Sequence, residues 1–137
     1  MSVEENKASI RAFFEMDVGQ SLDTVDELFH PDFVYHTLDG DIDREGYKQL
    51  NAAILASFPD CRYSLDDIIA EGDKVVERWT MYATHKAEFN GIPATNKEVV
   101  LSGVSIDRFS GGKIIETWQF YNPMSLLQQL GAFPATG

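Results

Sequence analysis

Apolar residues recur at helical spacing through the first half of the chain. Ser2 and Glu5 fit a capping box, in which each side chain accepts a hydrogen bond from the backbone N–H of the other residue. The apolar positions that follow fall on one helical face: Ile10, Phe13 and Phe14. Gly19 is a typical helix stop, so the pattern predicts a first helix between Ser2 and Gly19.

Two further helices and a short strand are predicted before residue 60. Apolar residues at positions i, i+3, i+6 and i+7 indicate a second helix, which His30-Pro31 ends: Leu22, Val25, Leu28 and Phe29. Phe33 to Thr37 is rich in β-prone residues and predicts a short strand. Asp43 can cap a third helix that Pro59 stops, with apolar positions at Tyr47, Leu50, Ile54 and Phe58.

The second half of the chain has the pattern of β-strands. Four strands are predicted: 62–70, 75–89, 98–110 and 114–121. The second of these is too long to be flat, so we expect a bend or bulge in it. Ser110-Gly111-Gly112-Lys113 is a hairpin signal because paired glycines supply positive φ angles, and the segment 90–97 is a loop. Pro123 then starts a closing helix that Gly131 ends.

Helices followed by long antiparallel strands predict an α+β protein. Three helices packed on one strongly curved antiparallel sheet, with a short C-terminal helix, would form a cone that encloses a pocket. No internal repeat, low-complexity stretch or linker divides the sequence, so we expect a single domain over residues 1–137.

The composition fits this class. The chain has 137 residues, of which 44% are hydrophobic and 24% charged, values that are ordinary for a soluble globular protein. The longest apolar run is Ala52 to Ala56, too short for a transmembrane span, and no signal peptide is visible. Cys61 is the single cysteine and cannot form an intrachain disulfide, so we expect a reducing cytoplasm.

The acidic charge is concentrated in the first half of the chain. The net charge is −11; residues 1–73 contribute −12 and residues 74–137 contribute +1. An acidic surface repels phosphate groups, so we expect neither nucleic acid nor an anionic membrane as a partner.

Several kinds of chemistry lack their motifs. The sequence contains no glycine-rich phosphate-binding loop, no nucleophile elbow and no zinc-binding motif. Three histidines, His30, His36 and His85, lack metal-site spacing, and no residue near Cys61 would lower the pKa of its thiol. We therefore expect no metal site and no cysteine nucleophile.

The remaining candidates are polar or aromatic residues on apolar strands. His85 has the parity of Trp79 and Met81, and Asn122 has the parity of a second set: Glu116, Trp118 and Phe120. Polar groups on such faces either cap a core or line a cavity. Asp107-Arg108 has the pattern of an ordinary strand pair, and Phe13 and Phe14 fit a core or the roof of a pocket.

Four segments taken together resemble the SnoaL-like polyketide cyclases, within the NTF2-like superfamily. The segments are 58–60, 84–95, 111–118 and 126–131, and the likeness extends over roughly residues 5–133. The resemblance implies an α+β cone, a homodimer formed through the sheet, and a deep pocket for an apolar small molecule. It also implies ring closure by intramolecular aldol addition, as in an ester cyclase, with no metal or organic cofactor.

The chain departs from this family at one position. The family motif E-x-W-x-x-x-D reads Glu116-x-Trp118-x-x-x-Asn122 here, and an amide cannot take up and return a proton. His85 and His36 match positions where the family commonly has histidines, and either is a substitute base. Asn122 would then orient a carbonyl or stabilise an enolate oxygen. Expected pocket walls are aromatic or apolar: Trp118, Trp79, Met81, Phe14 and Phe120.

Each candidate also has a structural interpretation. His85 fits a hydrogen-bonded core histidine, and His36 can anchor the loop at residues 39–41. Trp118 fits a core aromatic, and Asn122 before Pro123 can cap the closing helix.

Four functions follow as hypotheses. The first is a cyclase or isomerase acting on a polyketide-like carbonyl compound, and the second is a non-catalytic small-molecule binding protein that has lost the acid. An epoxide hydrolase is disfavoured because Arg78 is followed by Trp79-Thr80 and not by the expected R-x-D pair. A dimerisation or adaptor module would have its cavity filled by side chains.

Overall fold

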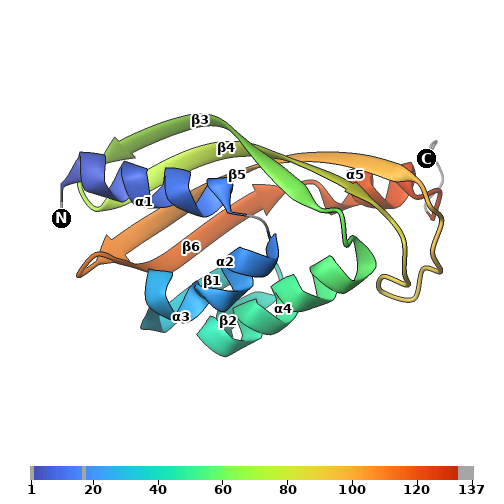
Figure 1. Ribbon diagram of the computed structural model, residues 1–137, viewed down its shortest axis with the longest axis horizontal. Helices are drawn as coiled ribbons and strands as arrows, with labels where there is room; N and C mark the ends of the chain where they lie inside the picture. Colours follow the sequence, from blue (N-terminus) through green and yellow to red (C-terminus); the bar gives the residue numbers. More distant parts are fainter. Residues whose placement is uncertain (1, 17, 133–137) are drawn as a thin grey trace.

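Six strands form one curved sheet in the computed structural model, which describes residues 2–16 and 18–132 (Figure 1). The strands are β1 Phe29–Thr37, β2 Gly40–Asp43, β3 Arg62–Glu71, β4 Lys74–Thr84, β5 Glu98–Ser110 and β6 Lys113–Tyr121. Their order is β2-β1-β6-β5-β4-β3, in which β1 pairs parallel to β6 and every other pair is antiparallel. The expected α+β class and curved sheet are confirmed.

The helices pack mainly on one face of this sheet. They are α1 Val3–Glu15, α2 Val18–Asp23, α3 Val25–Leu28, α4 Arg44–Ser57 and α5 Pro123–Gln129. The first, α1, packs on β3 and β4 at one edge of the sheet, whereas α4 packs on β1 and β2 at the opposite edge. The curved sheet therefore leaves a space between α1 and α4. No helix in the described part of the chain is long and apolar enough to cross a membrane.

Local hydrogen bonds confirm several predicted element ends. The Ser2–Glu5 capping box is present at the start of α1, and Asp43 caps α4 by accepting a hydrogen bond from the Gly46 N–H at 2.8 Å. Gly111 and Gly112 take φ angles of +58° and +83° in the β5–β6 turn, conformations that side chains rarely adopt.

The predicted boundaries of the first two helices are wrong. The first helix ends at Glu15, and Gly19 lies inside α2. The predicted second helix divides into α2 and α3 and stops before Phe29, which starts β1. Phe29 is drawn into the sheet because its backbone pairs with Ile114, and this tertiary pairing overrides the helical periodicity. The short strand β2 was not predicted.

The long predicted strand 75–89 is also corrected, since β4 ends at Thr84. The backbone N–H groups of Lys86 and Ala87 donate to the carbonyl oxygen of Ser57, at the end of α4, so the chain leaves the sheet there. The expected irregularity lies instead in the neighbouring strand β3, where the register with β4 shifts between Leu65 and Asp67. Pairing of β4 with β5 continues without a break from Lys74 to Thr84.

The N-terminal part of β5 extends beyond the end of β6, and a side chain of α5 pairs there with the backbone of β5. Gln129 of α5 accepts from the Val100 N–H and donates to the Val100 carbonyl oxygen, both at 2.8 Å. This amide replaces the missing strand partner and holds α5 against β5. Two apolar clusters pack on the inner face of the sheet, one around Phe58, Trp79 and Leu126 and the other around Phe29.

Candidate functional site

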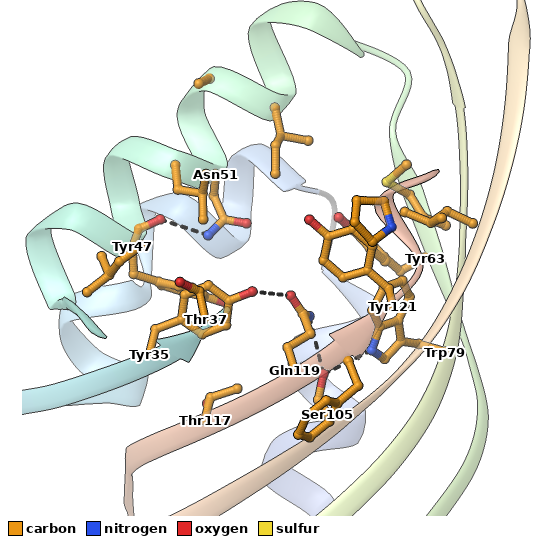
Figure 2. A pocket seen from close by; sticks show the side chains of 18 of the residues that line it. Tyr35, Thr37, Tyr47, Asn51, Tyr63, Trp79, Ser105, Thr117, Gln119 and Tyr121 are labelled. Atoms are coloured by element: carbon orange, nitrogen blue, oxygen red, sulfur yellow. Dashed lines mark hydrogen bonds between the residues drawn. The ribbon is translucent and has the colours of Figure 1, made fainter. Parts of the chain in front are cut away.

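A cavity of about 680 Å³ opens between the inner face of the sheet and the helices. Its size falls within the range of small-molecule sites, and aromatic side chains form much of its wall (Figure 2). Leu38, Phe120 and Tyr121 line it and are 89%, 56% and 43% exposed, so the mouth is apolar. An apolar mouth and wall suit a ligand that is itself largely apolar.

Two carboxyl groups lie in this wall. Glu77 of β4 and Asp107 of β5 both line the cavity and are only 2% and 4% exposed. Thr117 of β6 donates its hydroxyl hydrogen to Asp107 Oδ1. Glu77 Oε2 is buried and has no hydrogen-bond partner among the described residues. We call Glu77 and Asp107 the carboxyl pair.

No cation among residues 2–16 and 18–132 pairs with the carboxyl pair. Arg78 and Arg108, each next in the chain to a member of the pair, reach other acids and contact Asp66 and Glu116 respectively. Burial, followed by the nearby Asp107 charge, raises the pKa of Glu77 to about 12, and burial also raises the pKa of Asp107. Two close carboxyl groups in an apolar site cannot both ionise, so the pair holds one proton at neutral pH.

The contacts of the pair favour a proton on Glu77. The contact with Asp107 raises the pKa of Glu77, whereas the contacts with Glu77 and Thr117 favour the ionised form of Asp107. The pair therefore presents a carboxylate and a carboxylic acid side by side, which is the combination needed to take a proton from one atom of a ligand and give a proton to another.

A chain of hydrogen bonds crosses the cavity wall next to the carboxyl pair (Figure 2). The Tyr35 hydroxyl donates to Gln119 Oε1, and Gln119 Nε2 donates to Ser105 Oγ at 3.2 Å. Trp79 Nε1 donates to the same Ser105 Oγ at 2.9 Å. Four strands thus contribute one side chain each, and all four side chains line the cavity.

His85 follows the last residue of β4 and lies outside the residues that line the cavity. The side chain is fully buried, its Nδ1 contacts Thr95 Oγ1 at 3.0 Å, and its ring lies 5.4 Å from that of Phe58. The backbone of His85 also pairs with Asn96 and Lys97. The residue therefore fastens the loop that follows β4.

His36 and Trp118 stack on each other and lie away from the cavity. Their ring centroids are 4.9 Å apart, and His36 Nε2 contacts Glu116 Oε2 at 2.8 Å while Nδ1 contacts Asp41 Oδ1 at 2.7 Å. The hydrogen bond to Glu116 raises the pKa of His36, and the same contact lowers the pKa of Glu116. This cluster belongs to the outer face of the sheet, because the alternate residues of β6, Thr117 and Gln119, line the cavity.

Asn122 is the N-cap of α5. Its Oδ1 accepts from the Met124 N–H at 3.0 Å, and the side chain is absent from the cavity lining. Of the expected pocket walls, four line the cavity: Phe14, Trp79, Met81 and Phe120. The structure thus brings these apolar positions together and places His36, His85, Trp118 and Asn122 elsewhere.

The sequence interpretation missed the carboxyl pair. The sequence pattern predicts an ordinary strand pair of Asp107 with Arg108, but the two side chains point to opposite faces and only Asp107 is buried. A signal was available: Glu77 has the parity of Val75 and Trp79 on an alternating strand. An acidic residue on the strand face that otherwise carries apolar side chains indicates a buried carboxyl group.

The described residues 2–16 and 18–132 include no group of three or more histidine, cysteine, aspartate or glutamate side chains arranged to hold a metal ion. Burial raises the pKa of the Cys61 thiol, which disfavours the reactive thiolate.

Several solved structures are similar to this chain in fold and in part of their sequence. The solved structure of AclR, a proposed hydroxylase from Streptomyces galilaeus, is similar with a TM-score of 0.89 and 32% identity over 97% of this chain and 100% of AclR. IdmH, a proposed polyketide cyclase from Streptomyces antibioticus, is similar with a TM-score of 0.80 and 29% identity over 92% of this chain and 98% of IdmH. A proposed polyketide cyclase from Acidithiobacillus ferrooxidans is similar with a TM-score of 0.79 and 29% identity, covering 96% and 98% of the two chains.

No curated protein matches the sequence. A family model described as SnoaL-like polyketide cyclase matches residues 8–130, which is most of the chain. Together with the curved sheet and the cavity beneath it, this match shows that the chain belongs to the SnoaL-like polyketide cyclase family.

Proposed function

We propose that this protein is an acid–base enzyme that closes a ring in a polyketide-like carbonyl compound by intramolecular aldol addition. Asp107 acts as the base and Glu77 as the proton donor. The observation that carries the proposal is the carboxyl pair, which is buried in the wall of an apolar cavity with no cation from the described part of the chain beside it. Strongly perturbed carboxyl groups in a cavity are typical of acid–base sites.

The pair fits both halves of an aldol addition. Asp107 takes a proton from a carbon next to a carbonyl group, and the electron pair of the broken C–H bond forms an enolate. The enolate carbon then bonds to a second carbonyl carbon, whose oxygen becomes an alkoxide and receives the proton of Glu77. Proton transfer from Asp107 to Glu77 through their hydrogen bond restores the starting state.

A non-catalytic binding protein is the second candidate function. Asn122 stands where the family motif has an acid, and the cavity alone is sufficient for binding. The two candidates differ in proton transfer, which a binding protein does not catalyse.

Exchange of carbon-bound hydrogen for deuterium tests the first half of the reaction without the natural substrate. The probe is 2-tetralone, a bicyclic aromatic ketone, and exchange of its activated hydrogens in D₂O is followed by ¹H NMR. We expect the protein to accelerate exchange and Asp107→Asn to slow the catalysed rate on the order of 10²-fold or more. Asp67→Asn, an exposed aspartate of the same sheet, is the matched control and should keep the full rate.

Two more variants test whether the carboxyl pair, or the residues that the sequence predicted, carries out the exchange. Under the proposal, Asn122→Asp leaves the exchange rate unchanged, because the new carboxylate also caps α5. His85→Gln should likewise retain exchange in the fraction of protein that folds. Loss of exchange in His85→Gln at an unchanged melting temperature would assign the base to His85, and no exchange by the unmodified protein would favour the binding protein.

We also infer that two copies of the chain pair through the outer face of the sheet. The register places Ile106 opposite Trp118 on that face, Val104 and Val100 lie on the same face of β5, and Val100 is 51% exposed. An exposed apolar patch of this kind is typical of an interface. Light scattering after size exclusion should give the mass of a dimer, and Val104→Glu should shift it to the monomer; a monomeric unmodified chain contradicts the inference.

A further inference from the structure

Among the described residues, no hydrogen bond of Ser105 uses the hydrogen of its hydroxyl group. Its oxygen accepts hydrogen bonds from Trp79 Nε1 and from Gln119 Nε2. The indole N–H is a donor only, so the Ser105 hydrogen cannot point toward Trp79. Gln119 in turn accepts from the Tyr35 hydroxyl, which orients its amide nitrogen toward Ser105.

The hydroxyl hydrogen of Ser105 can therefore point only toward the cavity. Ser105 is 5% exposed and lines the cavity, and none of its hydrogen bonds to the described residues uses its hydrogen. Two donors on the oxygen polarise the O–H bond and make it a better donor, because hydrogen bonds in a chain strengthen one another. Ser105 therefore stands at the end of a chain of hydrogen bonds that starts at Tyr35, in the wall of the cavity (Figure 2).

Ser105 and Asp107 lie two residues apart on β5 and share its inner face. Strand geometry separates such residues by roughly 6–7 Å. In a ketone the carbonyl oxygen lies two bonds from the acidic carbon, so the oxygen can face Ser105 while the acidic carbon faces Asp107. The spacing suits a ketone whose acidic carbon faces Asp107 and whose oxygen faces Ser105.

We propose that Ser105 binds the oxygen of the ketone from which Asp107 removes a proton, and stabilises the enolate that forms. This inference rests on the proposed function for its base and extends it to the substrate: a ketone held by its oxygen at the inner sheet. The C–H proton passes to Asp107, the C–H electron pair becomes the enolate, and Ser105 keeps its proton while donating a hydrogen bond. Trp79, Gln119 and Tyr35 are positioning residues, which hold the donor in place before charge develops.

Two aromatic ligands test this donor without any catalysis. The first, 2-naphthol, has the planar C–OH group of an enol, and the second, 2-methylnaphthalene, has nearly the same shape without the oxygen. Affinities are measured by quenching of tryptophan fluorescence. We expect Ser105→Ala to weaken binding of 2-naphthol by roughly fivefold to tenfold, the effect of one hydrogen bond, and to leave 2-methylnaphthalene unchanged. The control Ser102→Ala makes the same change at an exposed position of the same strand and should alter neither.

Exchange of 2-tetralone then separates this inference from the proposed function. If the unmodified protein catalyses exchange, Ser105→Ala should lower the maximal rate on the order of 10²-fold, as loss of an oxyanion donor does. If it catalyses no exchange but Ser105→Ala still weakens 2-naphthol selectively, the enzyme proposal fails while Ser105 stands as the donor to the ligand oxygen. Equal effects of Ser105→Ala on both ligands, or a selective loss in Tyr35→Phe with none in Ser105→Ala, would overturn the assignment.

Discussion

Replacing Glu77 by glutamine should stabilise the protein at neutral and alkaline pH. The pKa of Glu77 is raised from 4.5 to about 12, chiefly by burial, so the folded protein keeps a proton that the unfolded chain releases. A group with a raised folded pKa stabilises fully below its unfolded pKa, and this stability is lost as the pH rises toward the folded pKa. Each pH unit above about 4.5 therefore lowers the free energy of unfolding by ~1.4 kcal/mol.

The expected size of the effect follows from that slope. Between pH 4.5 and neutral pH the proton on Glu77 destabilises the fold by about 3 kcal/mol, a large share of the 5–15 kcal/mol typical of a domain. In Glu77→Gln the amide donates to Asp107 as the carboxylic acid does, and Thr117 still donates to the same carboxylate. We expect these two donors to keep Asp107 ionised against the effect of its burial, so that the variant binds no extra proton on folding and loses the slope.

Urea unfolding followed by tryptophan fluorescence measures the difference. Between about pH 5.5 and about pH 8, the stability of Glu77→Gln relative to the unmodified protein should rise by about 3 kcal/mol. Glu71→Gln, an exposed glutamate at the end of β3, is the control and should follow the unmodified protein. Parallel curves for Glu77→Gln and the unmodified protein would mean that the carboxyl pair holds no proton, and the acid–base assignment would fall with it.

Two further predictions concern the cavity wall and the outer face. A Cβ at Gly103 would overlap Trp79 Cζ2, so Gly103→Ala should lower the free energy of unfolding by about 1–3 kcal/mol and weaken 2-naphthol binding, both measurable by fluorescence; an unchanged protein would refute the close contact. The contact with Glu116 raises the pKa of His36, so its stabilising effect is present below about pH 6.5 and is lost as the pH rises through the folded pKa. The stability difference between the unmodified protein and His36→Gln should therefore be larger at pH 6 than at pH 8.5, and a constant difference would refute the charged pair.

Much of the fold was predictable because its signals are local. The Ser2–Glu5 box, the Asp43 cap and the paired glycines of the hairpin involve atoms within a few residues of one another. The wrong boundaries have distant causes. Strand β4 ends at Thr84 because the following residues bind the Ser57 carbonyl oxygen, and no pattern near Thr84 encodes that contact.

The site was less predictable because strand parity identifies two faces without showing which one meets the helices. Trp118 and Glu116 do share a face, but it is the outer one, and the cavity is lined by Thr117 and Gln119. The same alternation on β4 and β5 carried the missing information. On β5 Asp107 alternates with Phe109 on the buried side, where an unpaired charge needs an explanation.

The carboxyl pair itself argues for catalysis over binding alone. A glutamine at residue 77 would have almost the same shape and could donate a hydrogen bond to Asp107, and its amide group would not have to take up a proton on folding. A binding protein or an adaptor would gain stability from that substitution and lose nothing, since the cavity would keep its volume and its aromatic wall. A buried, protonated glutamate beside an ionised aspartate is explained if the protein transfers that proton to a ligand. A Glu77→Gln protein that is more stable, binds 2-naphthol normally and no longer completes ring closure would show that stability has been given up for proton transfer.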